Sequence, residues 1–154
     1  MKARTIVLAV LVCLVCGTFA FAANPCAGTW KLNESKSMIA AGAPKNTSVV
    51  CAAAGDAMKI TVEGVDGQGK PAHNEWTGKF DGKDYPLTGD PTADTRAYKQ
   101  VDDHTQEFAN KKAGKVTITG QISYAADGKS RTVTATGTDP SGKKYEMKSV
   151  YDKQ

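Results

Sequence analysis

Gly28-Thr29-Trp30 opens the first strand-like run of the chain, and the rest of the sequence is organised around it. On its amino-terminal side lies an apolar leader. On its carboxyl-terminal side, apolar and polar residues alternate in short runs separated by turn sequences, which is typical of antiparallel strands. The motif therefore marks the place where the leader ends and a β-rich domain begins.

Residues 1–22 have the pattern of a secretory signal. Two basic residues precede an apolar run at positions 6–15, and Ala20-Phe21-Ala22 provides a small-x-small cleavage sequence. The apolar run is about ten residues long, whereas a membrane-spanning helix needs roughly 20. We therefore expect a single mature domain at 23–154, in the periplasm or medium of a bacterium, without stable insertion into the membrane.

The mature chain is close to electrically neutral. The leader contains two of the 20 basic residues and none of the 16 acidic ones, so the net charge falls from +4 to about +2 (18 basic less 16 acidic). Nucleic-acid binding therefore has no electrostatic support. The 132 remaining residues (154 less 22) suffice for one domain with a modest core, and we expect a monomer.

Cys26 and Cys51 are the two cysteines that remain after the leader. A chain addressed to an oxidising compartment is expected to pair them in a disulfide. A metal site is not expected, because His73 and His104 are isolated, and no neighbouring base marks a catalytic thiol. The sequence indicates no cofactor.

Turn sequences such as Asp66-Gly67 and Asp127-Gly128 divide the mature chain into short runs. In the run 114–125, alternate residues from Val116 to Tyr124 are apolar and share one face. Closing such strands on a shared interior also removes exposed sheet edges. We therefore predict an all-β fold, an antiparallel up-and-down barrel of eight to ten strands. The predicted strands are 28–33, 47–53, 57–65, 72–81, 83–88, 94–102, 105–111, 114–125, 130–138 and 143–152.

Asn33 to Ala43 is the one stretch with helical potential. Ser35 or Ser37 could cap a helical turn, and Gly42 would stop it. We predict one short helix or a lid-like loop between the first two strands.

A weak internal repeat aligns residues 60–66 with 133–139, and Gly69-Lys70 with Gly142-Lys143. Two interpretations remain open, a duplication and two hairpins that share a loop length. Both predict the same antiparallel unit in each half of the chain.

Four stretches of the mature chain are informative, namely Gly28-Thr29-Trp30-Lys31-Leu32-Asn33, Lys36-Ser37, Lys79-Phe80-Asp81-Gly82-Lys83-Asp84-Tyr85-Pro86 and Thr88-Gly89. In these motifs the sequence resembles the lipocalin and fatty-acid-binding-protein (calycin) superfamily, and more closely small secreted bacterial lipocalin-like proteins. The resemblance implies a barrel whose opening Trp30 packs across the closed end, often beneath a basic side chain from the last strand. Lys148 is the best-placed basic residue there, although its register points it outward with Glu146. Gly28 and Trp30 are therefore assigned structural roles.

Large apolar residues of several predicted strands fall on the inward faces and are candidates for the lining of a lumen. Small residues such as Gly64 and Ala135 share these faces, and the sequence does not decide whether the interior is filled or hollow. The candidate ligand-binding residues are Trp76, Phe80, Arg96, Tyr98, Tyr124 and Met147.

Arg96-Ala97-Tyr98 has the Arg-x-Tyr spacing with which fatty-acid-binding relatives hold a carboxylate. Residues two apart in a strand project to one side, so an inward face would bring both groups to one anion. The family places this pair on the last strand, whereas several strands follow here. The simpler interpretation, which the sequence favours, is an outward Arg96 beside Asp94 in a solvated strand.

No catalytic constellation is recognised, and we do not expect an enzyme. Asp102-Asp103-His104 lies between two short predicted strands, where a polar turn accounts for it. Two functions remain. The first is a barrel that binds a small hydrophobic or amphipathic ligand in its lumen. The second is a filled barrel without ligand that acts as an envelope protein-interaction module or inhibitor.

Overall fold

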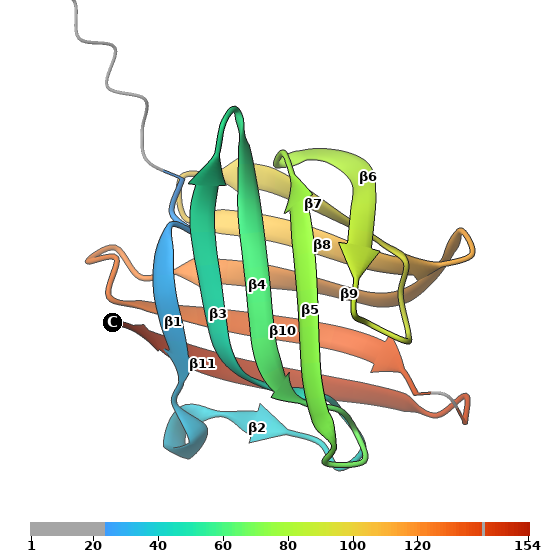
Figure 1. The fold of residues 1–154 in the computed structure, drawn as a ribbon. Coiled ribbons are helices and arrows are strands. Elements are labelled where there is room, and N and C mark those ends of the chain that lie inside the picture. The colour runs from blue at the N-terminus through green and yellow to red at the C-terminus, as the bar shows by residue number, and fades with distance from the viewer. Residues whose placement is uncertain (1–23, 140) are drawn as a thin grey trace, which may run out of the picture.

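The computed structural model describes residues 24–139 and 141–154, so the predicted signal at 1–22 lies outside the described residues. Ten antiparallel strands form one closed barrel (Figure 1), as the sequence predicted. From β3 onward each strand pairs with the next along the chain, and β1 pairs with both β3 and β11. The barrel strands are β1 (Gly28–Leu32), β3 (Lys45–Ala54), β4 (Ala57–Val65), β5 (Pro71–Gly78), β6 (Asp81–Thr88), β7 (Thr95–Asp102), β8 (Thr105–Lys112), β9 (Lys115–Tyr124), β10 (Ser130–Thr138) and β11 (Lys144–Lys153).

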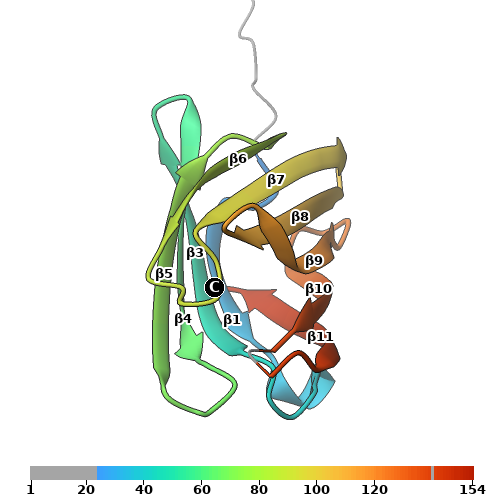
Figure 2. The ribbon, with the colours of Figure 1, turned by 90° about the vertical axis from the view of Figure 1, so that its right-hand side faces the viewer.

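Alternating side chains separate the interior of the barrel from solvent. In β9, Ile118 and Ile122 are buried, whereas Thr119 between them is exposed. Val116 was predicted to join this inner face but is exposed, because the pairing of β8 with β9 shifts register between Asn110 and Lys111. Figure 2 shows β3, β4 and β5 on one side of the barrel and β7 to β11 on the other.

The connection from β1 to β3 contains little helix. A single 3₁₀ turn, η1 (Glu34–Lys36), is followed by the two-residue strand β2 (Met38–Ile39). Because β1 covers only the last residues of the long strand β11, the remaining edge of β11 is free to pair with β2. The expected short helix is therefore one turn, and the rest of the segment extends the sheet.

The two repeat units form the same hairpin turn. In the β4–β5 turn the amide of Asp66 donates to the carbonyl oxygen of Lys70, and in the β10–β11 turn the amide of Asp139 donates to that of Lys143, each at 2.9 Å. Each aspartate side chain also accepts a hydrogen bond from the amide of that lysine. The two halves of the chain thus build the same antiparallel unit.

Among the barrel strands, backbone pairing is shortest between β5 and β6, which pair at only two positions. Trp76 of β5 spans this gap, since its indole Nε1 donates to the carbonyl oxygen of Arg96 in β7 at 2.8 Å. The Trp76 ring also packs edge-on against Phe80, Tyr85 and Tyr98. This aromatic cluster closes the wall of the barrel where backbone pairing is short.

Candidate ligand-binding lumen

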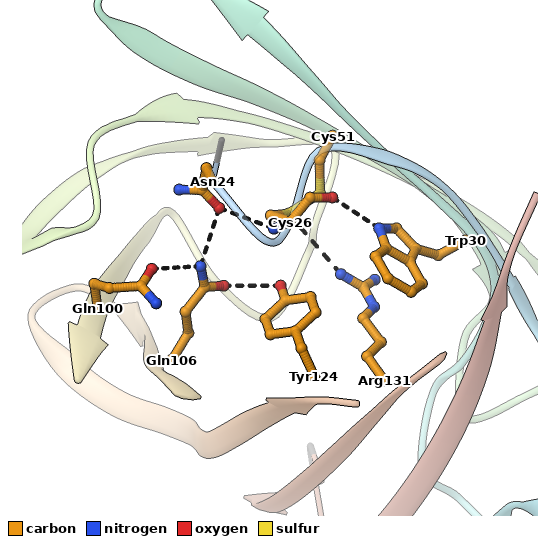
Figure 3. The surroundings of a disulfide bond; sticks show 8 residues. All are labelled: Asn24, Cys26, Trp30, Cys51, Gln100, Gln106, Tyr124 and Arg131. Atoms are coloured by element: carbon orange, nitrogen blue, oxygen red, sulfur yellow. Dashed lines mark hydrogen bonds between the residues drawn. A yellow bond between two sulfur atoms is a disulfide. The ribbon is translucent and has the colours of Figure 1, made fainter. Parts of the chain in front are cut away.

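The closed end of the barrel is built on Trp30, which is fully buried. Its indole Nε1 donates a hydrogen bond to the carbonyl oxygen of Cys26 at 2.7 Å. Cys26 forms the predicted disulfide with Cys51 of β3, which ties the segment before β1 to the barrel wall (Figure 3). The disulfide and Trp30 together form the floor of the interior.

Two basic side chains lie over the Trp30 ring. Lys153 of β11 places its Nζ 5.3 Å from the ring centroid, and Arg131 of β10 places its Cζ at 4.8 Å. Gly28 makes room for this arrangement, because its φ is 124° and a Cβ there would meet the Cε of Lys153 at 2.6 Å. Lys148 is exposed on the outer face, so Lys153 is the basic residue of the last strand that reaches Trp30.

A polar network covers the rest of the floor. Gln106 of β8 is fully buried, and its Nε2 donates to Asn24 at 3.1 Å and to Gln100 at 2.7 Å. The hydroxyl of Tyr124 donates to Gln106 Oε1 at 2.9 Å (Figure 3). Burial raises the pKa of Tyr124 to about 12. Tyr124, a predicted lumen residue, therefore belongs to the floor.

Above the floor the barrel encloses a cavity of about 540 Å³. This volume is many times what a single water molecule needs, so the side chains of the barrel do not fill the interior. The loops that precede β3, β5, β7 and β11 contribute to the lining, which places the mouth at the end opposite Trp30. The apolar part of its wall includes Val49, Ile60, Val62, Phe108, Ile118, Ile122 and Val133.

The side chain of Arg96 points inward, which differs from the outward position that the sequence favoured. Its side chain is only 7% exposed and lines the cavity, whereas the sequence favoured an outward position beside Asp94. The guanidinium Nε donates to Asn110 Oδ1 at 2.7 Å, and Nη1 lies 3.5 Å from Asn74 Oδ1. These two side-chain amides come from β8 and β5. Because they are neutral, they hydrogen-bond to the inward guanidinium without cancelling its charge. Within the described residues, Arg96 forms no ion pair with a carboxylate.

The structure brings only some of the predicted lumen residues to the cavity. Tyr98 and Met147 line it together with Arg96, whereas Trp76 and Phe80 pack in the wall cluster beside β6. Asn74 and Asn110 line the cavity and were not singled out from the sequence. Asn74 shares the inward register of Trp76, but Asn110 gave no signal.

The carboxylates that reach the cavity lie in the loops at its mouth. Asp66, Asp90 and Asp139 each accept a hydrogen bond from a backbone amide of their own turn. These interactions stabilise the turns. The deeper part of the lumen therefore contains positive charge without a matching negative group among the described residues.

Two other charged groups that the sequence offered lie in a turn and on the outer face. In the Asp102-Asp103-His104 segment the amide of His104 donates to Asp102 Oδ1, which is the expected turn. His73 lies on the outer face beside Glu63. The described part of the chain holds no group of three or more potential metal-ligating side chains. None of its helices is long and apolar enough to cross a membrane.

The geometry defines a class of molecule, an antiparallel barrel with an open lumen and a plugged floor. Comparison with protein-family models and with curated proteins finds no match to this chain.

Proposed function

We propose that the protein is a lipocalin-like carrier that binds a small amphipathic molecule with an anionic group inside its barrel. The single observation that carries this proposal is the cavity of about 540 Å³ in which a buried Arg96 has no carboxylate partner among the described residues. Pockets of roughly 300–1,000 Å³ with apolar walls and a few polar groups are the usual form of small-molecule sites.

Each part of the lumen supports a different part of the ligand. The apolar wall favours a hydrocarbon body, because transfer from water contributes about 25 cal/mol per Å² of buried apolar surface. Arg96 favours an anion, since a guanidinium presents several N–H donors in a plane and stays charged at all ordinary pH values. Asn74 and Asn110 hold Arg96 in place without neutralising it. The disulfide fits a carrier that works in an oxidising compartment.

The experiment is a calorimetric titration of delipidated protein with saturated fatty acids from octanoate to hexadecanoate. Arg96→Gln should weaken binding by about tenfold or more, because a buried charge-assisted hydrogen bond is lost. Lys99→Gln is the matched control, since Lys99 lies on the same strand, is exposed and carries the same charge. It should leave the affinity unchanged.

A mass spectrum of the lipid extract from natively purified protein tests occupancy without choosing a ligand. A bound acidic amphiphile at a stoichiometry near one supports the proposal. An empty extract together with no measurable binding of any acid in the series would refute it.

A further inference from the structure

A second guanidinium lines the same lumen, at the end closed by the disulfide. Arg131 of β10 is 4% exposed, and its Cζ lies over the rings of Trp30 and Tyr151 at 4.8 and 5.0 Å. The two rings attract the positive charge through their faces. They offer no acceptor to the N–H groups at the edge of the guanidinium.

The edge of Arg131 is poorly satisfied by its surroundings. The hydrogen bond from Nη1 to the sulfur of Cys26 is 3.9 Å long, and sulfur is a weak acceptor (Figure 3). The hydroxyl of Tyr124 also lies near this guanidinium. Burial raises the pKa of that hydroxyl, and the positive charge of Arg131 opposes this with a smaller effect. Nε is buried and has no hydrogen-bond partner. As for Arg96, no carboxylate in the described part of the chain pairs with Arg131. A buried charge in this state is costly, and an anion that joins it removes the cost.

The two arginines form separate sites. Arg96 contacts Asn74 and Asn110 from β5 and β8, whereas Arg131 contacts the floor of the barrel. Their strands, β7 and β10, are not neighbours in the sheet. Their aromatic neighbours also differ, since Arg96 lies over the ring of Tyr98 and Arg131 lies over those of Trp30 and Tyr151. Apolar side chains such as Ile122 and Val133 line the cavity that both arginines reach.

We propose that the ligand carries two carboxylate groups on an apolar body, one bound by Arg96 and the other by Arg131. This inference rests on the proposed carrier function and adds to it the chemical class of the ligand. A planar carboxylate matches the planar N–H edge of a guanidinium in two parallel hydrogen bonds. An ordinary fatty acid would satisfy one arginine and leave the other unpaired.

The test compares each α,ω-dicarboxylate with the monocarboxylate of the same length, from octanoate and octanedioate to the hexadecanoate pair. For at least one length the diacid should bind wild-type protein about tenfold or more tightly than the monoacid. Arg131→Gln should reduce this ratio to about one. Lys153→Gln is the matched control, because it also removes a cation over Trp30 but lies outside the cavity lining, and it should keep the ratio.

A spectroscopic readout keeps the proposal testable if the Arg131 variant does not fold. In a Trp76→Phe chain, Trp30 is the only tryptophan left of the two in the sequence. A diacid bound at Arg131 should change the Trp30 emission, whereas the monoacid at Arg96 should not. Equal affinities at every length with unchanged Trp30 emission would overturn the second carboxylate alone. Failure of every acid to bind would instead overturn the carrier function.

Discussion

Burial raises the pKa of two tyrosine side chains, Tyr124 and Tyr151, to about 12. In the unfolded chain a tyrosine loses its proton near pH 10, so between about pH 10 and 12 the unfolded state binds fewer protons than the folded state. Stability is therefore fully present below pH 10 and is lost as pH rises toward 12, by about 2–3 kcal/mol for each tyrosine.

Urea unfolding measured at intervals from pH 9 to 12 checks this prediction. Tyr124→Phe and Tyr151→Phe should each reduce the slope of stability against pH in that window, whatever their effect at pH 9. Slopes identical to wild type in both variants would contradict the burial of the two hydroxyls.

For single residues, the sequence predicts the inward or outward direction of apolar side chains better than that of charged ones. The sequence predicts a buried, structural Trp30, whereas it favours an outward Arg96 and indicates no role for Arg131, although both arginines are buried. Arg131 lies two residues before Val133 on a strand with period-two alternation, so its inward direction was available in the pattern. Because the inner face of a strand is assigned from its apolar residues, an arginine on that face is overlooked. The amides beside Arg96 and the rings beside Arg131 come from strands other than those that carry the two arginines.

The strands themselves were almost fully predictable. The runs 57–65 and 130–138 are β4 and β10 without change, and the other barrel strands agree to within a few residues at each end. Alternation and turn glycines act locally, which is why the sequence reveals them. Register shifts depend on two strands at once and stayed hidden, including the one between Asn46 and Ser48 where β3 meets β4. The pairing of β2 with β11 is another such long-range feature.

Gly64 of β4 pairs with Asn46, next to the register shift between β3 and β4. A Cβ at Gly64 would collide with backbone atoms of Lys45 and Asn46 in β3, whereas a Cβ at Gly137 would meet chiefly the side chain of Tyr145. A side chain can rotate away but a paired strand cannot. Gly64→Ala should therefore destabilise the protein by about 2 kcal/mol or more, and Gly137→Ala by less. Equilibrium urea unfolding compares the two, and a greater loss for Gly137→Ala would contradict this account of the bulge.

The volume of the lumen is a property of the whole barrel rather than of any single strand. It depends on how ten strands tilt and how their inner side chains share the interior, and the sequence left a filled barrel and a hollow one equally open. The structure contains a cavity of about 540 Å³, and Trp76 and Tyr124 pack into the wall and floor rather than into that space. Arg96 and Arg131 reach that space from two strands, β7 and β10, that are not neighbours in the sheet.

The Cys26–Cys51 disulfide holds the floor of the closed barrel. It joins residues 25 apart, so it restricts the unfolded chain and should stabilise the folded state by about 3 kcal/mol. The double variant Cys26→Ser, Cys51→Ser should lose about this amount in urea unfolding and keep its β-sheet circular dichroism. Intact-mass analysis of wild-type protein alkylated without reduction should find no modified thiol. Two alkyl groups per chain would contradict the bond, and a variant with wild-type stability would contradict its role. Because Trp30 bonds to the carbonyl of Cys26, the variant should also shift Trp30 emission toward that of a more exposed indole.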